Sequence, residues 1–99
     1  MQKAKVDHIA LQVQDIQTSV AWYQEHFHAD LLYQDASWAF LQLANIKLAL
    51  VLPHQHPPHV AFTSKHAAKY GDLVRHRDGT RSVYISDPSG NQLEVMQAD

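Results

Sequence analysis

The strongest constraint on this chain of 99 residues is an internal repeat. Three pairs of segments match in the same order along the two halves: His8-Ile9-Ala10-Leu11 with His59-Val60-Ala61-Phe62, Asp30-Leu31-Leu32 with Asp72-Leu73-Val74, and Lys47-Leu48-Ala49-Leu50-Val51 with Gln92-Leu93-Glu94-Val95-Met96. Ordered matches of this kind indicate two copies of one supersecondary unit. Short apolar strands can resemble one another by chance, but three matches in the same order favour a duplication, so we expect the chain to fold as a pair of similar modules.

Each half is predicted to form one strand, one helix and three further strands. Period-two alternation and turn signals place strands at 6–13, 31–33, 38–43, 46–52, 59–63, 72–77, 81–86 and 92–97. Helices are expected at 16–27, after the N-cap residue Asp15, and more briefly at 65–70, before Gly71. The fold class is therefore α+β. We expect one domain over residues 1–99, with two βαβββ modules at about 5–53 and 59–98 that form a curved mixed sheet around a cleft.

Composition excludes several classes of protein and partner. The chain has no cysteine, so it has no disulfide framework, and its formal charge of −2 gives no nucleic-acid-binding signature. The longest apolar run, 48–52, is far too short to span a membrane, and the N-terminus lacks the apolar region of a signal peptide. We therefore expect a cytoplasmic protein without membrane or nucleic-acid partners. We also expect a homodimer, because so small a sheet leaves an apolar face to cover.

Strand alternation brings three metal-competent side chains onto the more polar faces of three strands. His8 belongs to the first strand, His59 to the fifth and Glu94 to the last. One such histidine alone is more often a structural or exposed residue, but the symmetric placement of two favours a shared role. Two imidazoles and one carboxylate suit a divalent transition metal, without choosing among Zn, Mn, Fe, Co and Ni. Ala49 is the repeat partner of Glu94 and cannot bind, so coordination positions stay open for water or substrate.

Other side chains are candidates for lining the substrate cleft. They are Gln12, Thr63, Tyr84 and Met96. If the assigned parity holds, Tyr84 shares a face with Ser82 and Ser86 and is a candidate hydrogen-bond donor or proton relay; with the opposite parity it is a core residue. His54 and His56 lie in a proline-rich loop, where they either contact ligand or metal partners or are solvated, and the remaining histidines are expected to be solvated. No residue stands out as a general base.

Nearly the whole chain resembles the vicinal oxygen chelate superfamily, which includes glyoxalase I, extradiol dioxygenases and the fosfomycin and bleomycin resistance proteins. The resemblance lies in Asp7-His8-Ile9-Ala10-Leu11-Gln12-Val13, in His59-Val60-Ala61-Phe62 and above all in Ser86-Asp87-Pro88-Ser89-Gly90-Asn91-Gln92-Leu93-Glu94-Val95. It implies the ligand set His8, His59 and Glu94, and a substrate bound to the metal through adjacent oxygens. Glyoxalase I has a further glutamate ligand on the fourth strand, where this chain has Ala49 or its neighbours Leu48 and Leu50, and fosfomycin resistance enzymes usually have threonine where it has Ala10.

Two functions follow from the resemblance and the candidate ligands. The first is a metal-dependent enzyme with lyase, isomerase or dioxygenase-like chemistry on a small oxygen-bearing molecule. The alternative is a metal-free protein of the bleomycin-resistance type that binds a small molecule between aromatic side chains, for which Trp22, Tyr33 and Trp38 are candidates. Retention of three potential ligands favours the enzyme.

Overall fold

The computed structural model describes residues 3–76 and 78–98 of the chain, and these form two compact units. The N-terminal unit spans His8–Pro58, and the C-terminal unit combines the stretch from His59 onward with the residues before His8. Strand β1 (Lys5–Gln12) therefore starts in the C-terminal unit and continues into the N-terminal unit. The module bounds expected from the sequence, about 5–53 and 59–98, stay a prediction.

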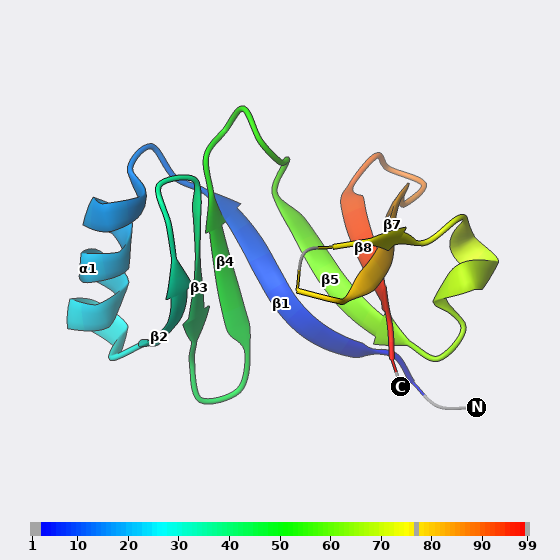
Figure 1. The fold of residues 1–99 in the computed structure, drawn as a ribbon, viewed down its shortest axis with the longest axis horizontal. Coiled ribbons are helices and arrows are strands. Elements are labelled where there is room, and N and C mark those ends of the chain that lie inside the picture. The colour runs from blue at the N-terminus through cyan, green and yellow to red at the C-terminus, as the bar shows by residue number, and fades with distance from the viewer. Residues whose placement is uncertain (1–2, 77, 99) are drawn as a thin grey trace. The chain divides into compact units, whose positions relative to one another are not determined.

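The N-terminal unit contains one helix and a four-stranded sheet. Besides β1 its elements are α1 (Ile16–Phe27), β2 (Asp30–Gln34), β3 (Trp38–Gln42) and β4 (Lys47–Val51). The strand order is β2-β3-β4-β1 (Figure 1). Strands β2, β3 and β4 are antiparallel neighbours, whereas β1 and β4 run parallel, so the sheet is mixed.

Helix α1 packs on one face of this sheet and forms the core with it. Its buried residues are Ile16 and Val20, and they contact a cluster that includes Leu41, Leu48 and Leu50. The alternating residues Ile9, Leu11 and Val13 pack against the same cluster, as their spacing predicts. The opposite residues of β1, including His8, therefore face away from the helix.

The ends of α1 follow from local hydrogen bonding. The Asp15 side chain accepts a hydrogen bond from the Thr18 backbone N–H at 3.2 Å, which satisfies a free donor of the first turn. At the other end His28 adopts the left-handed conformation with φ of 55°, and its N–H donates to the Gln24 carbonyl. The left-handed residue ends the helix and turns the chain toward β2.

The C-terminal unit repeats the strand arrangement with a smaller helical element. Its elements are β5 (His59–Ser64), η1 (Ala67–Tyr70), β6 (Val74–Arg75), β7 (Arg81–Ser86) and β8 (Gln92–Gln97). Their order is β5-β8-β7-β6, with β5 and β8 parallel (Figure 1). The short helix expected at 65–70 is observed as the 3-10 helix η1, which begins two residues later, at Ala67. The strand expected at 72–77 is observed only as β6, and residue 77 lies outside the described part of the chain.

Strand registers show that the two units share one framework. Ala10 pairs with Ala49 in the N-terminal unit, and Ala61 pairs with Glu94 in the C-terminal unit. In each case the pair lies two residues beyond a histidine, His8 or His59. Position 49 is thus structurally equivalent to position 94, as the sequence repeat predicts. The α+β class with two modules of mixed strands is confirmed.

No helix in the described residues is long and apolar enough to cross a membrane.

The carboxylate of Asp35 stabilises the turn between β2 and β3 through hydrogen bonds, and this can be tested. Its carboxylate accepts hydrogen bonds from the Tyr33 hydroxyl and from the backbone N–H groups of Ser37 and Trp38, and these bonds hold its pKa well below the usual 3.8. Because a lowered pKa stabilises the fold fully above the unfolded-state value, this contribution declines as pH falls below 3.8 toward the lower folded-state pKa. Asp35→Ala should lower the urea midpoint at neutral pH, and the difference from wild type should shrink in acid. A difference independent of pH would contradict this origin.

Candidate metal centre

Adjacent strands of the C-terminal unit place four functional side chains on one face. Tyr84 of β7 lies directly opposite Glu94 of β8, and Ala61 of β5 lies opposite Glu94 on its other side. His59 is two residues before Ala61, and Ser82 is two residues before Tyr84, so both project to the same face as Glu94. Leu93 and Val95 alternate to the other face. The predicted parity of Tyr84 with Ser82 and Ser86 is therefore correct.

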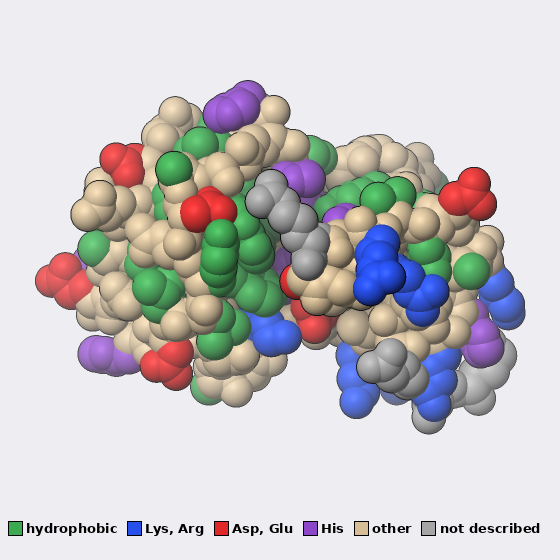
Figure 2. All heavy atoms as spheres, viewed as in Figure 1, with side chains coloured by type: hydrophobic (Ala, Val, Ile, Leu, Met, Phe, Trp, Pro, Cys, Tyr) green, Lys and Arg blue, Asp and Glu red, His purple; other side chains and the backbone are tan. Residues whose placement is uncertain are grey.

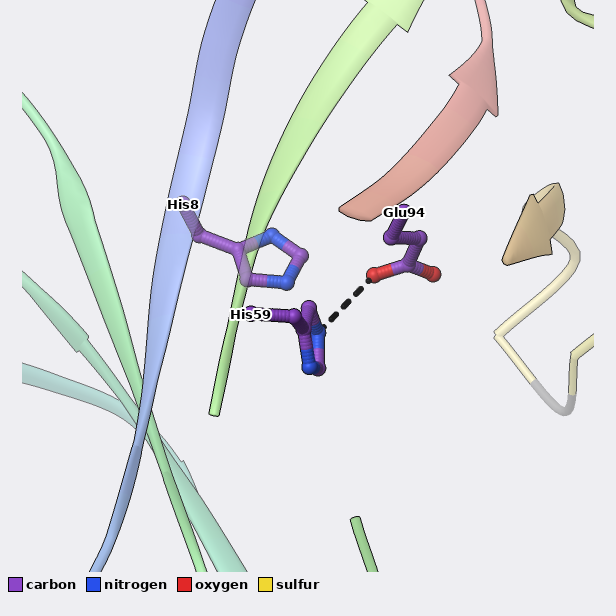
Figure 3. A group of neighbouring side chains, drawn as sticks. All are labelled: His8, His59 and Glu94. Carbon is purple, nitrogen blue, oxygen red and sulfur yellow. Dashed lines mark ion pairs between the residues drawn. The ribbon is translucent and has the colours of Figure 1, made fainter. Parts of the chain in front are cut away.

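The centre of this face is a buried pair of side chains. His59 Nε2 lies 3.3 Å from Glu94 Oε1, and the two residues are only 7% and 5% exposed (Figure 3). A histidine and a carboxylate so far removed from water must be compensated by close partners, because an isolated buried charge is costly. His59 and Glu94 must therefore stay close to polar or charged partners in the folded unit.

The second carboxylate oxygen of Glu94 has its own partners. The Ser82 hydroxyl donates to Glu94 Oε2 at 2.7 Å, and Ser82 is completely buried. His76 Nε2 lies 2.6 Å from Ser82 Oγ and 3.7 Å from Glu94 Oε2. Sequence reasoning missed both residues and treated His76 as solvated. Ser82 could have been found from its parity with Tyr84, whereas His76 is brought in by the β6–β7 hairpin, whose pairing the sequence did not define.

Tyr84 forms the rim of the same group. Its ring meets the His59 ring edge to face, with centroids 5.4 Å apart and an angle of 88°. Burial, the negative charge of Glu94 and a hydrogen bond to Glu94 raise the pKa of Tyr84 well above its usual 10.0. The phenol thus stays protonated at neutral pH and acts as a hydrogen-bond donor there.

His8 has an equivalent setting in the N-terminal unit. It is 8% exposed, and its ring meets Phe40 edge to face at 5.4 Å and 89°. Phe40 is opposite Ala49, just as Tyr84 is opposite Glu94, so the histidine–aromatic pair occurs once in each unit. Where the C-terminal unit has a carboxylate, the N-terminal unit has only the buried methyl group of Ala49.

The donor types of these residues suit a divalent metal. The C-terminal unit offers the His59 imidazole and the Glu94 carboxylate, and His8 of the N-terminal unit is a further imidazole among these candidate ligands (Figure 3). At metal–ligand distances of about 2.1 Å, two neighbouring ligands of one ion lie about 3.0–3.4 Å apart. The His59–Glu94 separation of 3.3 Å falls in this range and exceeds the usual length of a charge-assisted hydrogen bond, about 2.7–2.9 Å.

The predicted cleft residues differ in their surroundings. Thr63 and Met96 are opposite one another on β5 and β8, on the face that carries His59 and Glu94, and both are partly buried. Gln12 instead donates to the His56 carbonyl at 2.9 Å. With residues 53–57, which include His54 and His56, Gln12 lines a shallow pocket of about 290 Å³.

Histidine abundance alone does not mark the site. Five of the eight histidines are exposed, namely His26, His28, His54, His56 and His66. Histidine side chains accordingly appear at separate places on the surface in Figure 2. Burial and strand position, rather than number, distinguish His8 and His59.

Aromatic side chains continue outward from His8 on the same face of the N-terminal unit. Phe40 lies 5.6 Å from Trp38, and Trp38 lies 5.0 Å from Tyr33, measured between ring centroids. Trp22, in contrast, stacks on His26 along the exposed side of α1. Two of the three aromatic candidates for ligand binding therefore lie in one row, and Trp22 lies outside it.

Comparison with known proteins identifies the family. The model of the Glyoxalase/Bleomycin resistance protein/Dioxygenase superfamily matches residues 5–72. The chain belongs to this superfamily. This confirms the resemblance inferred from the two strand openings and the last turn.

Solved structures of the superfamily fold resemble the chain over almost its full length. Methylmalonyl-CoA epimerase of Streptomyces coelicolor is 16% identical with a TM-score of 0.76, covering 98% of this chain and 99% of the other. A hypothetical protein of Bacillus halodurans is 18% identical with a TM-score of 0.75 over 99% and 96%. Methylmalonyl-CoA epimerase of Mycobacterium tuberculosis is 17% identical with a TM-score of 0.73 over 95% and 87%. At these identities the likeness concerns the fold alone.

The protonated state of Tyr84 can be tested in the metal-free protein by absorbance titration of its four tyrosines. One tyrosine should ionise well above the usual 10.0, and Tyr84→Phe should abolish that late transition. Glu94→Gln should move it part of the way down, because the charge is removed while the burial remains. An unchanged late transition in Glu94→Gln would contradict the assigned role of the carboxylate, provided that circular dichroism shows an intact fold.

Proposed function

We propose that this protein is a metal-dependent enzyme that binds one divalent ion through His8, His59 and Glu94. The observation that carries the proposal is the buried His59–Glu94 pair, whose 3.3 Å separation suits two ligands of one ion. His8 adds a second buried imidazole from the equivalent strand position of the other unit. Two imidazoles and one carboxylate are a ligand set of catalytic metal sites with open positions.

The chemistry proposed is the activation of a small oxygen-bearing substrate bound through adjacent oxygens. A bound divalent ion would supply a Lewis acid that polarises such oxygens. Because position 49 carries alanine, this chain offers three protein ligands and leaves room for substrate oxygens. Lyase, isomerase or dioxygenase-like reactions are all compatible with this role.

Tyr84 is proposed to orient the substrate. Its protonated hydroxyl donates to Glu94 in the protein alone, and a substrate oxygen would take the place of Glu94 as acceptor of that hydrogen bond, so Tyr84 would act as a donor rather than a base. Thr63 and Met96, further along the same face, are proposed to line the substrate site. Gln12 is proposed to line it from β1, where it already anchors the proline-rich loop.

A second candidate function is metal-free binding of a small planar molecule. The specific observation in its favour is the row of Tyr33, Trp38 and Phe40, which offers stacking surface on the face that carries His8. Such a binder would not need the buried His59–Glu94 pair, so metal affinity distinguishes the two functions.

We also propose that the protein is cytoplasmic and works as a homodimer. The exposed apolar side chains Trp22, Phe27 and Leu32, in and just after α1, would be covered in a dimer.

The proposed metal site predicts a selective loss of metal binding. Untagged wild-type protein should bind about one equivalent of Zn²⁺ or Mn²⁺ in calorimetric titration. His59→Ala should weaken that binding by at least about 100-fold, since even residues outside the ligand shell contribute 10- to 100-fold. His66→Ala removes an exposed histidine outside the proline-rich loop and serves as the control. Equal affinity in wild type and His59→Ala would refute the site, and absence of metal binding in wild type would favour the metal-free function.

A further inference from the structure

We propose that Ser82 and His76 are positioning residues that hold Glu94 as a one-oxygen metal ligand. They do so through a directed chain of hydrogen bonds to Glu94 Oε2, which leaves Oε1 facing His59. This inference rests on the proposed function, because it concerns the ligand Glu94. It adds two residues that neither the sequence pattern nor the family comparison singles out.

The direction of the hydrogen bonds follows from the chemistry of the three groups. An ionised carboxylate only accepts, so the single hydroxyl proton of Ser82 must point to Glu94 Oε2, 2.7 Å away. Ser82 Oγ can then only accept from His76 Nε2, at 2.6 Å, so this nitrogen carries a proton. The chain runs from His76 through Ser82 to Glu94 and needs no charge on His76.

Burial makes Ser82 difficult to replace. Ser82 has no exposed surface, and Glu94 is 5% exposed, so bulk water does not substitute for a missing hydroxyl. His76 Nε2 is 3.7 Å from Glu94 Oε2, beyond hydrogen-bond length, so it acts mainly through Ser82. Without the chain, Oε2 would be free to rotate toward a bound ion and bind it as a second oxygen.

The hairpin between β6 and β7 fixes the first member of the chain. The His76 backbone N–H donates to the Thr80 carbonyl at 2.7 Å, and the Gly79 N–H donates to the His76 carbonyl at 3.0 Å. These two bonds hold the backbone at His76 and so limit where its imidazole can lie. Residues that hydrogen-bond to a metal ligand orient that ligand in this way.

The other unit supports a link between hydroxyl and carboxylate. Ser82 is opposite Met96, two residues beyond Glu94, and its equivalent Trp38 is opposite Val51, two residues beyond Ala49. The unit without the carboxylate also lacks the hydroxyl. The two groups thus occur together in one unit and are absent together from the equivalent positions of the other.

The test uses Co²⁺ as the probe, with affinity measured by chelator competition and ligand geometry by visible absorption. Ser82→Ala and His76→Leu should each weaken binding about 10- to 100-fold and change the Co²⁺ spectrum. Ser82→Thr keeps the hydroxyl, and His76→Gln keeps an N–H donor at similar reach, so both should restore affinity and spectrum toward wild type. Ser86→Ala, at the exposed end of the same strand, is the matched control.

The outcomes separate this inference from the proposed function. If Ser82→Ala and His76→Leu lose only thermal stability, and bind Co²⁺ with wild-type affinity and spectrum, the positioning role is overturned while the metal site stands. If wild type and His59→Ala bind Co²⁺ equally, the proposed function fails and the inference fails with it. Should Ser82→Ala not fold, the pair His76→Leu and His76→Gln decides, because His76 is partly exposed.

Discussion

The burial of the Glu94 carboxylate is the constraint on which the rest of the site depends. A carboxylate removed from water must be matched by donors or cations, and an unpaired one would be severely destabilising. Here His59 lies against Oε1, the Ser82 hydroxyl donates to Oε2, and the Tyr84 hydroxyl makes a further hydrogen bond to the carboxylate. The parallel β5–β8 and antiparallel β7–β8 pairings bring these partners together from three strands. The sheet therefore sets the geometry of the site, and the partners it brings to Glu94 offset the free-energy cost of burying the carboxylate.

The two units share one framework, but their functional side chains differ. Both units place a histidine against an aromatic ring at equivalent positions, His8 with Phe40 and His59 with Tyr84. Only the C-terminal unit adds the carboxylate and its hydroxyl partner. The N-terminal unit instead has Ala49 and a row of aromatic rings that begins at Phe40. In the proposed enzyme one unit supplies most of the metal chemistry, and the other supplies one ligand and an apolar surface.

Much of this organisation could be predicted, because the amino-acid sequence shows both the period-two alternation of the strands and the internal repeat. The face of β1 that carries His8, the equivalence of Ala49 and Glu94 and the parity of Tyr84 all follow from a period of two. The 3-10 form of η1 could not be predicted, since four residues give too little periodicity to distinguish helix types. His76 was missed because its role depends on a hairpin in which β6 has only two residues. Contacts made across such short elements depend on tertiary geometry rather than on local pattern.

The central claim is that two imidazoles and the Glu94 carboxylate bind one ion, and X-ray absorption at the metal edge tests it most directly. Protein loaded with one equivalent of Zn²⁺ should show two imidazole ligands together with oxygen donors. His8→Ala and His59→Ala, each loaded at a zinc concentration sufficient for binding, should show one imidazole fewer. A site with fewer than two imidazoles in wild type, or an imidazole count that both substitutions leave unchanged, would contradict the account.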